Sequence, residues 1–129
     1  MTILEFAPLS FGPLLQGFRH QAGLTGTAAA RAAGIDPSYL NRMERGEREP
    51  PGRELTLALA RALALPAPDR DALLVAAGHF PEAIHRLGAL DSTLLLVASL
   101  LADGRIPVAE QQEFRQIVQL VARRWRPEA

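Results

Sequence analysis

Apolar residues recur at helical spacing along most of the chain, and short segments rich in glycine, proline or charged residues separate them. Leu14, Leu15 and Phe18 form one apolar stripe, and Leu59 and Leu63 lie on another. Because runs of β-branched residues and strict alternation are scarce, the pattern predicts an all-α fold. We expect helices over residues 10–21, 25–33, 36–45, 53–64, 69–77, 81–87, 92–102 and 107–124.

The second and third predicted helices are short and nearly adjacent. Thr25 and Asp36 can cap their N-termini, and Pro37 takes the first position of the third helix, where proline is favoured. Gly34 can adopt the positive φ that ends a helix in a tight turn. Two short helices joined by such a turn form a helix-turn-helix unit.

The third predicted helix turns its apolar residues inward and leaves a polar face outside. In helix-turn-helix proteins the N-terminal part of this helix lies in the major groove of DNA. We therefore expect base contacts from Pro37, Ser38, Asn41 and Arg42. Arg42 can bond to guanine, the commonest specific pairing, or instead bind phosphate or stay solvated. Glu44 is expected to bond to nearby backbone or to an arginine, since a carboxylate repels phosphate.

The last fifty or so residues carry a different pattern. The predicted helix over 92–102 is apolar on nearly every side and must be buried all round. The helix over 107–124 has an apolar stripe and a polar opposite face. The two helices predict a dimerisation module, although they could instead complete the core of one protomer. The expected contact residues are Leu94, Val97, Leu101, Phe114, Ile117, Val118, Val121 and Trp125.

Composition narrows the chemistry. The formal net charge is zero, so any basic surface must be local, and all 14 basic residues are arginine. There is no cysteine, and His20, His79 and His85 lack the spacing of metal ligands, so we expect no metal, no cofactor and no enzyme activity. With no secretion signal and no apolar run of membrane-spanning length, we expect a cytoplasmic, nucleoid-associated protein and no membrane partner.

The segment FRHQAGLTGTAAARAAGIDPSYLNRMERGEREPPGRELTLALARALAL (residues 18–65) resembles the five-helix phage-repressor-like DNA-binding domain of the Cro/C1 or XRE family. The resemblance extends from about residue 11 to residue 78. It implies a double-stranded DNA operator as partner, read by the four outward residues named above. It also implies phosphate contacts near Thr25, Tyr39, Arg45, Arg48 and Arg53.

Some positions within this resemblance have other interpretations. The family commonly has glutamine after the threonine of its second helix, whereas Gly26 stands here and lacks that phosphate contact. Tyr39 can pack on the third helix instead of binding phosphate. The loop arginines alternate with Glu47, Glu49 and Glu54, so they can instead form a mixed-charge surface.

The segment LLADGRIPVAEQQEF near the end of the chain, behind such a domain, resembles the DdrO-type repressors of the deinococcal radiation and desiccation response. In that family a separate zinc metalloprotease of the IrrE type cuts near the last helices. By resemblance, the susceptible loop is 102–107 and the bond is Arg105–Ile106. Asp-Gly between two predicted helices is independently a loop signal. Without lysine, the chain cannot cleave itself by Ser–Lys chemistry.

We therefore expect two domains: residues 1–78, which bind DNA, and residues 79–129, three helices that dimerise. The leading hypothesis is a homodimeric repressor of a DNA-damage regulon that a partner protease inactivates. A second is an antitoxin or phage-type regulator whose tail binds another protein. A third is an interaction module that has lost DNA binding, which the zero net charge would suit.

Overall fold

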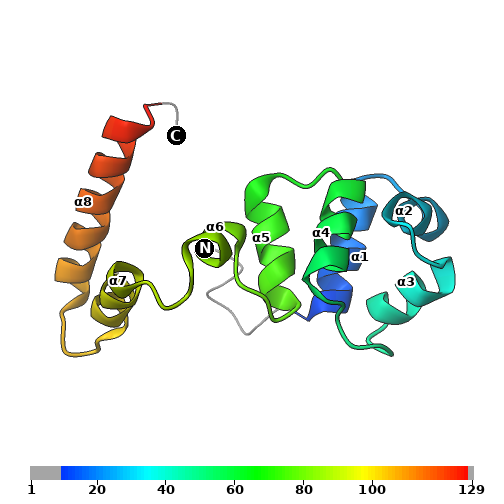
Figure 1. Ribbon diagram of the computed structural model, residues 1–129, viewed down its shortest axis with the longest axis horizontal. Helices are drawn as coiled ribbons and strands as arrows, with labels where there is room; N and C mark the ends of the chain where they lie inside the picture. Colours follow the sequence, from blue (N-terminus) through cyan, green and yellow to red (C-terminus); the bar gives the residue numbers. More distant parts are fainter. Residues whose placement is uncertain (1–9, 128–129) are drawn as a thin grey trace. The chain divides into compact units, whose positions relative to one another are not determined.

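The computed structural model describes residues 10–127, and all regular elements in this range are α-helices, which confirms the predicted all-α fold. Each of these helices begins and ends within two residues of the predicted bounds. The fifth begins earlier than expected because Pro68 fits its first turn, where no N–H is needed. The helices are α1 Phe11–Gln21, α2 Gly26–Ala33, α3 Pro37–Glu44, α4 Arg53–Ala62, α5 Ala67–Ala76, α6 Glu82–Leu87, α7 Ser92–Ala102 and α8 Val108–Trp125 (Figure 1).

The chain divides into two compact units, and the boundary between them along the chain lies between Arg86 and Leu87. The sequence suggested a division after residue 78 instead. The difference arises at α6, because Asp71 accepts a hydrogen bond from the backbone N–H of Glu82 and Arg53 binds the carboxylate of the same residue. These bonds attach α6 to the first unit.

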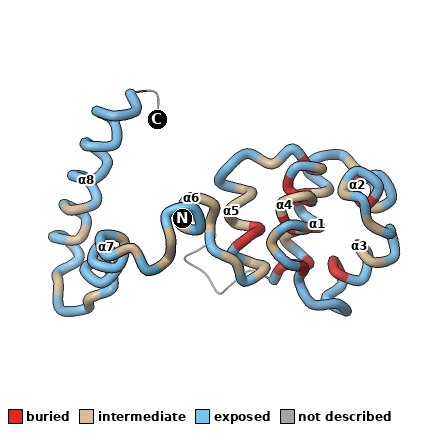
Figure 2. Tube along the Cα trace, in the orientation of Figure 1, coloured by how far each residue is buried: buried red, intermediate tan, exposed pale blue. Residues whose placement is uncertain are grey.

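The hydrophobic core lies within the first unit, among α1 to α5. In this unit α2 packs on α3 and α4, α1 packs on α3 and α5, and α4 packs on α5. Figure 2 shows the buried positions gathered where these helices meet. The core consists of Phe11, Leu15, Phe18, Ala29, Ala30, Leu40, Met43, Leu59, Ala60, Leu63 and Leu73.

A left-handed residue ends α2 and another follows α4. Gly34 has φ of 76°, and the next N–H, that of Ile35, reaches back to Ala30 O at 2.9 Å. The same geometry follows α4, where Ala64 has φ of 51° and the N–H of Leu65 bonds to Ala60 O at 3.0 Å. Gly34 was predicted from its residue type, whereas nothing in the sequence distinguishes Ala64 from a helical alanine.

The second unit has no buried residue among those that the structure describes, as Figure 2 shows. In Figure 1, α7 is seen nearly end-on while α8 runs along the picture, so the two helices cross steeply. A single protomer does not bury α7 all round, since Leu95 and Leu96 are 46% and 58% exposed, and its complete burial by a second copy stays a prediction. One copy of this unit does not complete a core.

Candidate DNA-binding interface

The N-termini of α2 and α3 are capped by the residues that the sequence predicted. Thr25 Oγ1 accepts a hydrogen bond from the N–H of Ala28 at 3.0 Å. Asp36 Oδ1 accepts one from the N–H of Ser38 at 2.7 Å and another from its hydroxyl at 2.5 Å. These bonds lower the pKa of Asp36, the hydroxyl bond most, because they stabilise the carboxylate. By contrast Ser10, at the N-cap position of α1, makes no side-chain cap hydrogen bond.

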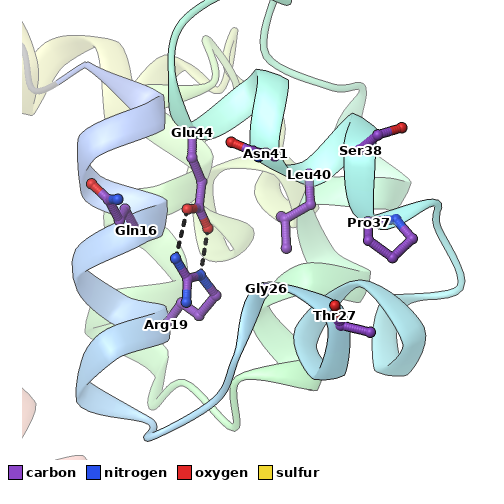
Figure 3. A pocket seen from close by; sticks show the side chains of 9 residues that line it. All are labelled: Gln16, Arg19, Gly26, Thr27, Pro37, Ser38, Leu40, Asn41 and Glu44. Carbon is purple, nitrogen blue, oxygen red and sulfur yellow. Dashed lines mark hydrogen bonds and ion pairs between the residues drawn. The ribbon is translucent and has the colours of Figure 1, made fainter.

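A buried ion pair fixes α3 to α1. Arg19 of α1 donates from Nε and Nη2 to the two carboxylate oxygens of Glu44 on α3, at 2.7 and 2.9 Å (Figure 3). Its Nη1 also donates to Leu24 O, at 3.0 Å, in the turn that leads into α2. The bond to Glu44 raises the pKa of Arg19. The prediction that Glu44 bonds to an arginine is confirmed, and Arg19 holds both helices of the helix-turn-helix unit.

The start of α1 and the end of α3 also meet backbone to backbone. A Cβ atom added to Gly12 would lie 2.6 Å from Met43 O and 2.5 Å from Glu44 O. Both distances are shorter than van der Waals contact, and the neighbours are backbone atoms that cannot turn away. Glycine at position 12 is therefore required for this spacing between α1 and α3.

The outward face of α3 is exposed, as the apolar pattern predicted. Leu40 and Met43 are buried beneath it, and Tyr39 is half-buried against the core. The four residues expected to contact bases all lie on the exposed side: Pro37, Ser38, Asn41 and Arg42. Their contact with bases stays a prediction.

A concavity of about 400 Å³ lies between α1, α2 and α3 beside this face. Ser38 and Asn41 of α3 line it together with Gln16 of α1 and Thr27 of α2, as Figure 3 shows. Gln16 and Thr27 were not among the residues expected at the DNA-binding face. Gln16 carried a usable signal, since it is a polar residue beside the apolar stripe of α1, whereas Thr27 carried none beyond its place near the cap.

Two arginines of the α3–α4 loop (residues 45–52) are near α3. The guanidinium carbon of Arg48 lies 5.6 Å from the centre of the Tyr39 ring, a cation–π contact. Arg45 is 59% exposed and its Nε lies 3.8 Å from a carboxylate oxygen of Glu47. An exposed pair at this distance is weak, so it leaves Arg45 available to a stronger anion.

The third arginine in this region is held within the fold. Arg53 Nη1 donates to Phe80 O at 2.8 Å, and its Nη2 forms an ion pair with Glu82. The bond from Arg53 holds the pKa of Glu82 below its usual range. The side chain of Arg53 is only 17% exposed. The phosphate contact expected of Arg53 stays a prediction. Within the protein, Arg53 links the start of α4 to Phe80 and Glu82, which sequence spacing could not reveal.

The expected dimerisation residues divide into two sets. Leu94, Val97, Leu101 and Phe114 are half-buried. The four on the outer part of α8, namely Ile117, Val118, Val121 and Trp125, are 41% to 78% exposed. Together with Leu95 and Leu96 they leave an apolar surface on both helices of the second unit.

The expected cleavage loop joins α7 to α8. Arg105 is 91% exposed at its side chain and bonds back to Asp103, and Ile106 is half-buried. Gln111 of α8 donates to Asp103 O at 3.1 Å, which ties the loop to α8. Loops with exposed residues between helices are sites where proteases cut, and cleavage at Arg105–Ile106 stays a prediction.

Neither a metal site nor a membrane span occurs in the described part of the chain. No group of three or more His, Asp or Glu side chains there could hold a metal ion. None of the helices there is long and apolar enough to cross a bilayer.

With short α2, a tight left-handed turn and an exposed α3 held by α1, the first unit has the geometry of a helix-turn-helix domain. Residues 10–73 match a protein-family model described as a helix-turn-helix domain. No curated protein and no solved structure matches the chain. The chain thus carries an N-terminal helix-turn-helix domain, and this domain supports a DNA-binding transcription regulator.

Proposed function

We propose that the protein is a homodimeric, sequence-specific repressor, not an enzyme, that binds a palindromic DNA operator. The observation that carries this proposal is the exposed face of α3, presented by a capped and buried scaffold in a helix-turn-helix domain. Asn41 and Arg42 supply the amide and guanidinium groups that pair with adenine and guanine edges in the major groove. Arg45 and Arg48 supply positive charge beside them for the phosphates.

The second copy is proposed to bind through the C-terminal unit. This unit exposes apolar side chains on α7 and α8 and buries none of its described residues. A partner that covers these side chains would give the unit the hydrophobic core that a single copy lacks. A second identical surface is the partner that a self-complementary two-fold interface requires. It also fits the palindromic operator, since two recognition helices must lie about 34 Å apart to read successive major grooves.

The apolar stripe of α8 gives the proposed dimer a moderate stability. Fully burying a large aliphatic or aromatic side chain is worth roughly 1.5–3 kcal/mol, so Phe114, Ile117, Val118, Val121 and Trp125 contribute at most on the order of 10 kcal/mol. The contribution is smaller than this because one protomer already covers part of each side chain. Association entropy and side-chain ordering are subtracted from this sum. Joining two half-sites raises avidity by about 10²–10⁴, so loss of the dimer releases the operator.

Inactivation is proposed to occur by cleavage in the α7–α8 loop, at Arg105–Ile106, by a zinc metalloprotease of the IrrE type. The resemblance to DdrO-type repressors and the exposure of Arg105 support this step. A cut here separates α8, with Ile117, Val121 and Trp125, from α7 and removes much of the proposed dimer surface. The regulon proposed on the same resemblance is a DNA-damage response.

Selection from random-sequence DNA tests the DNA-binding step. The full chain is expected to enrich duplexes with two inverted half-sites, and the logarithm of its binding constant for them should fall linearly with the logarithm of salt concentration. Enrichment without a salt dependence, or no enrichment at all, would contradict the proposal and favour an interaction module. Incubation with an IrrE-type protease, followed by mass determination, tests the cut.

A second candidate function rests on the same apolar surface. In an antitoxin or phage-type regulator the C-terminal unit would bind a different protein rather than a second copy. Sedimentation of the purified chain separates the two candidates. A monomer that becomes a stable heterocomplex with the product of a neighbouring gene favours the second candidate, whereas a homodimer in the absence of other proteins favours the first.

A further inference from the structure

The end of the α3–α4 loop is bonded to the segment that leads toward the second unit. Arg53, the first residue of α4, binds Phe80 O and the Glu82 carboxylate, as described above. Two residues before Arg53, at Pro51, the carbonyl oxygen lies 3.0 Å from His79 Nε2. Two independent contacts therefore join the turn after α5 to the same three-residue stretch at the start of α4.

Glu82 is itself held in place from the other side. Its backbone N–H donates to Asp71 Oδ1 of α5 at 3.2 Å, so the residue is bonded to both α4 and α5. The side chains of Arg53 and Glu82 are only 17% and 25% exposed. Partial removal from water makes this pair stronger than a solvent-exposed ion pair.

The same loop contacts α3 at its other end, through the stacking of Arg48 on Tyr39. The loop therefore lies between the proposed base-reading helix on one side and α6 on the other. The position of Arg45 and Arg48 relative to Asn41 and Arg42 decides whether both pairs can reach one duplex together. The bonds at Pro51 and Arg53 fix one end of that geometry.

We propose that Glu82 is a positioning residue, which acts through Arg53 to set the α3–α4 loop for DNA and to couple this loop to α6. The proposal rests on the DNA-binding function proposed above. Glu82 is the first residue of α6, so this pair joins the start of α6 to the start of α4, where the α3–α4 loop ends.

The variant Glu82→Gln, made in the full chain, removes the charge that binds Arg53. Its matched control is Glu54→Gln, which removes the same charge from an exposed side chain one residue after Arg53. Hydrogen exchange of backbone amides in residues 45–52 should be about tenfold faster in the first variant, because a charge-assisted bond that closes the loop is lost. The control should exchange like the unaltered chain. Equal exchange in all three chains overturns the proposal.

Binding supplies a second readout that overall destabilisation would not reproduce. On the duplex that the unaltered chain enriches from a random pool, Glu82→Gln should lose about tenfold in affinity, while the control, which also sheds one negative charge, should not weaken. The unfolding midpoint of each variant is measured as well, because a variant whose midpoint is unchanged cannot owe its loss of affinity to unfolding. An affinity for that duplex equal to that of the control overturns the proposal.

A double-variant cycle tests whether Glu82 acts through Arg53. If Glu82 acts only through Arg53, Arg53→Gln together with Glu82→Gln loses no more affinity than Arg53→Gln alone. Additive losses would show that Glu82 does not act through Arg53 and would overturn the assigned role. If no duplex is enriched by the unaltered chain, the proposed DNA-binding function fails, and the exchange measurement alone still decides the coupling between α6 and the loop.

Discussion

Single residues set the local geometry of the helix-turn-helix domain. Thr25 and Asp36 cap their helices because a short side chain with an oxygen can reach the free N–H groups of the first turn. Gly12 permits the backbones of α1 and α3 to touch, and Gly34 takes the left-handed conformation that ends α2. The caps and Gly34 were predictable from residue type and local spacing, whereas Gly12 depends on a neighbour more than 30 residues away in the sequence.

Among residues 10–127, Ala64 is the one non-glycine residue with a left-handed backbone conformation. The left-handed conformation costs an L-residue with a side chain roughly 1–2 kcal/mol. Glycine avoids this strain, but it loses more backbone entropy on folding, which offsets part of the gain. Ala64→Gly should therefore raise the free energy of unfolding by up to about 1 kcal/mol. The matched variant Gly34→Ala should lower it by about the same amount. Urea denaturation measures both, and a destabilised Ala64→Gly would contradict the account.

Arg42 is the residue on α3 best suited to recognise a base. Arg42→Ala should cost about 1–3 kcal/mol of binding free energy on the selected duplex and relax the preference at one position of each half-site. Competition binding against duplexes changed at single positions provides the measurement. A loss of equal size on every sequence, with a salt slope reduced by about 1, would instead assign Arg42 to a phosphate.

At the scale of elements, the position of α3 follows from contacts that are distant in sequence. The ion pair between Arg19 and Glu44 joins residues 25 positions apart, and the pair between Arg53 and Glu82 joins residues 29 apart. Helical periodicity, caps and turns predicted the helices, because these signals are local. They could not predict which arginine binds which carboxylate, so the ion pair by which Arg53 holds α6 was not expected from the sequence.

The stability of α3 is expected to depend on pH through its cap. The pKa of Asp36 is lowered by the hydroxyl and N–H of Ser38, so the carboxylate is favoured in the folded protein. The stabilisation is therefore complete above the ordinary aspartate pKa of about 3.9 and is lost as pH falls through the lower folded value.

A variant without this titration provides the comparison. Asp36→Asn keeps an acceptor for the N–H of Ser38 but has no charge to lose, so its unfolding free energy should fall less steeply with acid than that of the unaltered chain. Urea denaturation followed by circular dichroism at a series of pH values gives both curves. Curves that run parallel through the acid range would show that the cap does not contribute in this way.

At the scale of the whole molecule, the two units differ in how completely one copy folds. The first buries a core drawn from five helices, whereas the second buries none of its described residues. The sequence predicted apolar helices at the C-terminus because the number and spacing of their apolar residues can be taken directly from the chain. It could not predict how they cross, and therefore which side chains a single chain leaves exposed. The exposed side chains of α7 and α8 are what make the C-terminal unit the proposed dimer contact.

The most direct test of this account is the mass of the particle in solution, measured by light scattering or sedimentation for the full chain and for a chain truncated after Arg105. The full chain should be a dimer that binds the selected duplex as a dimer. The truncated chain should be a folded monomer with a helix-turn-helix domain and weak operator affinity. A full chain that stays monomeric on DNA, or a truncated chain that still dimerises, would contradict the central claim.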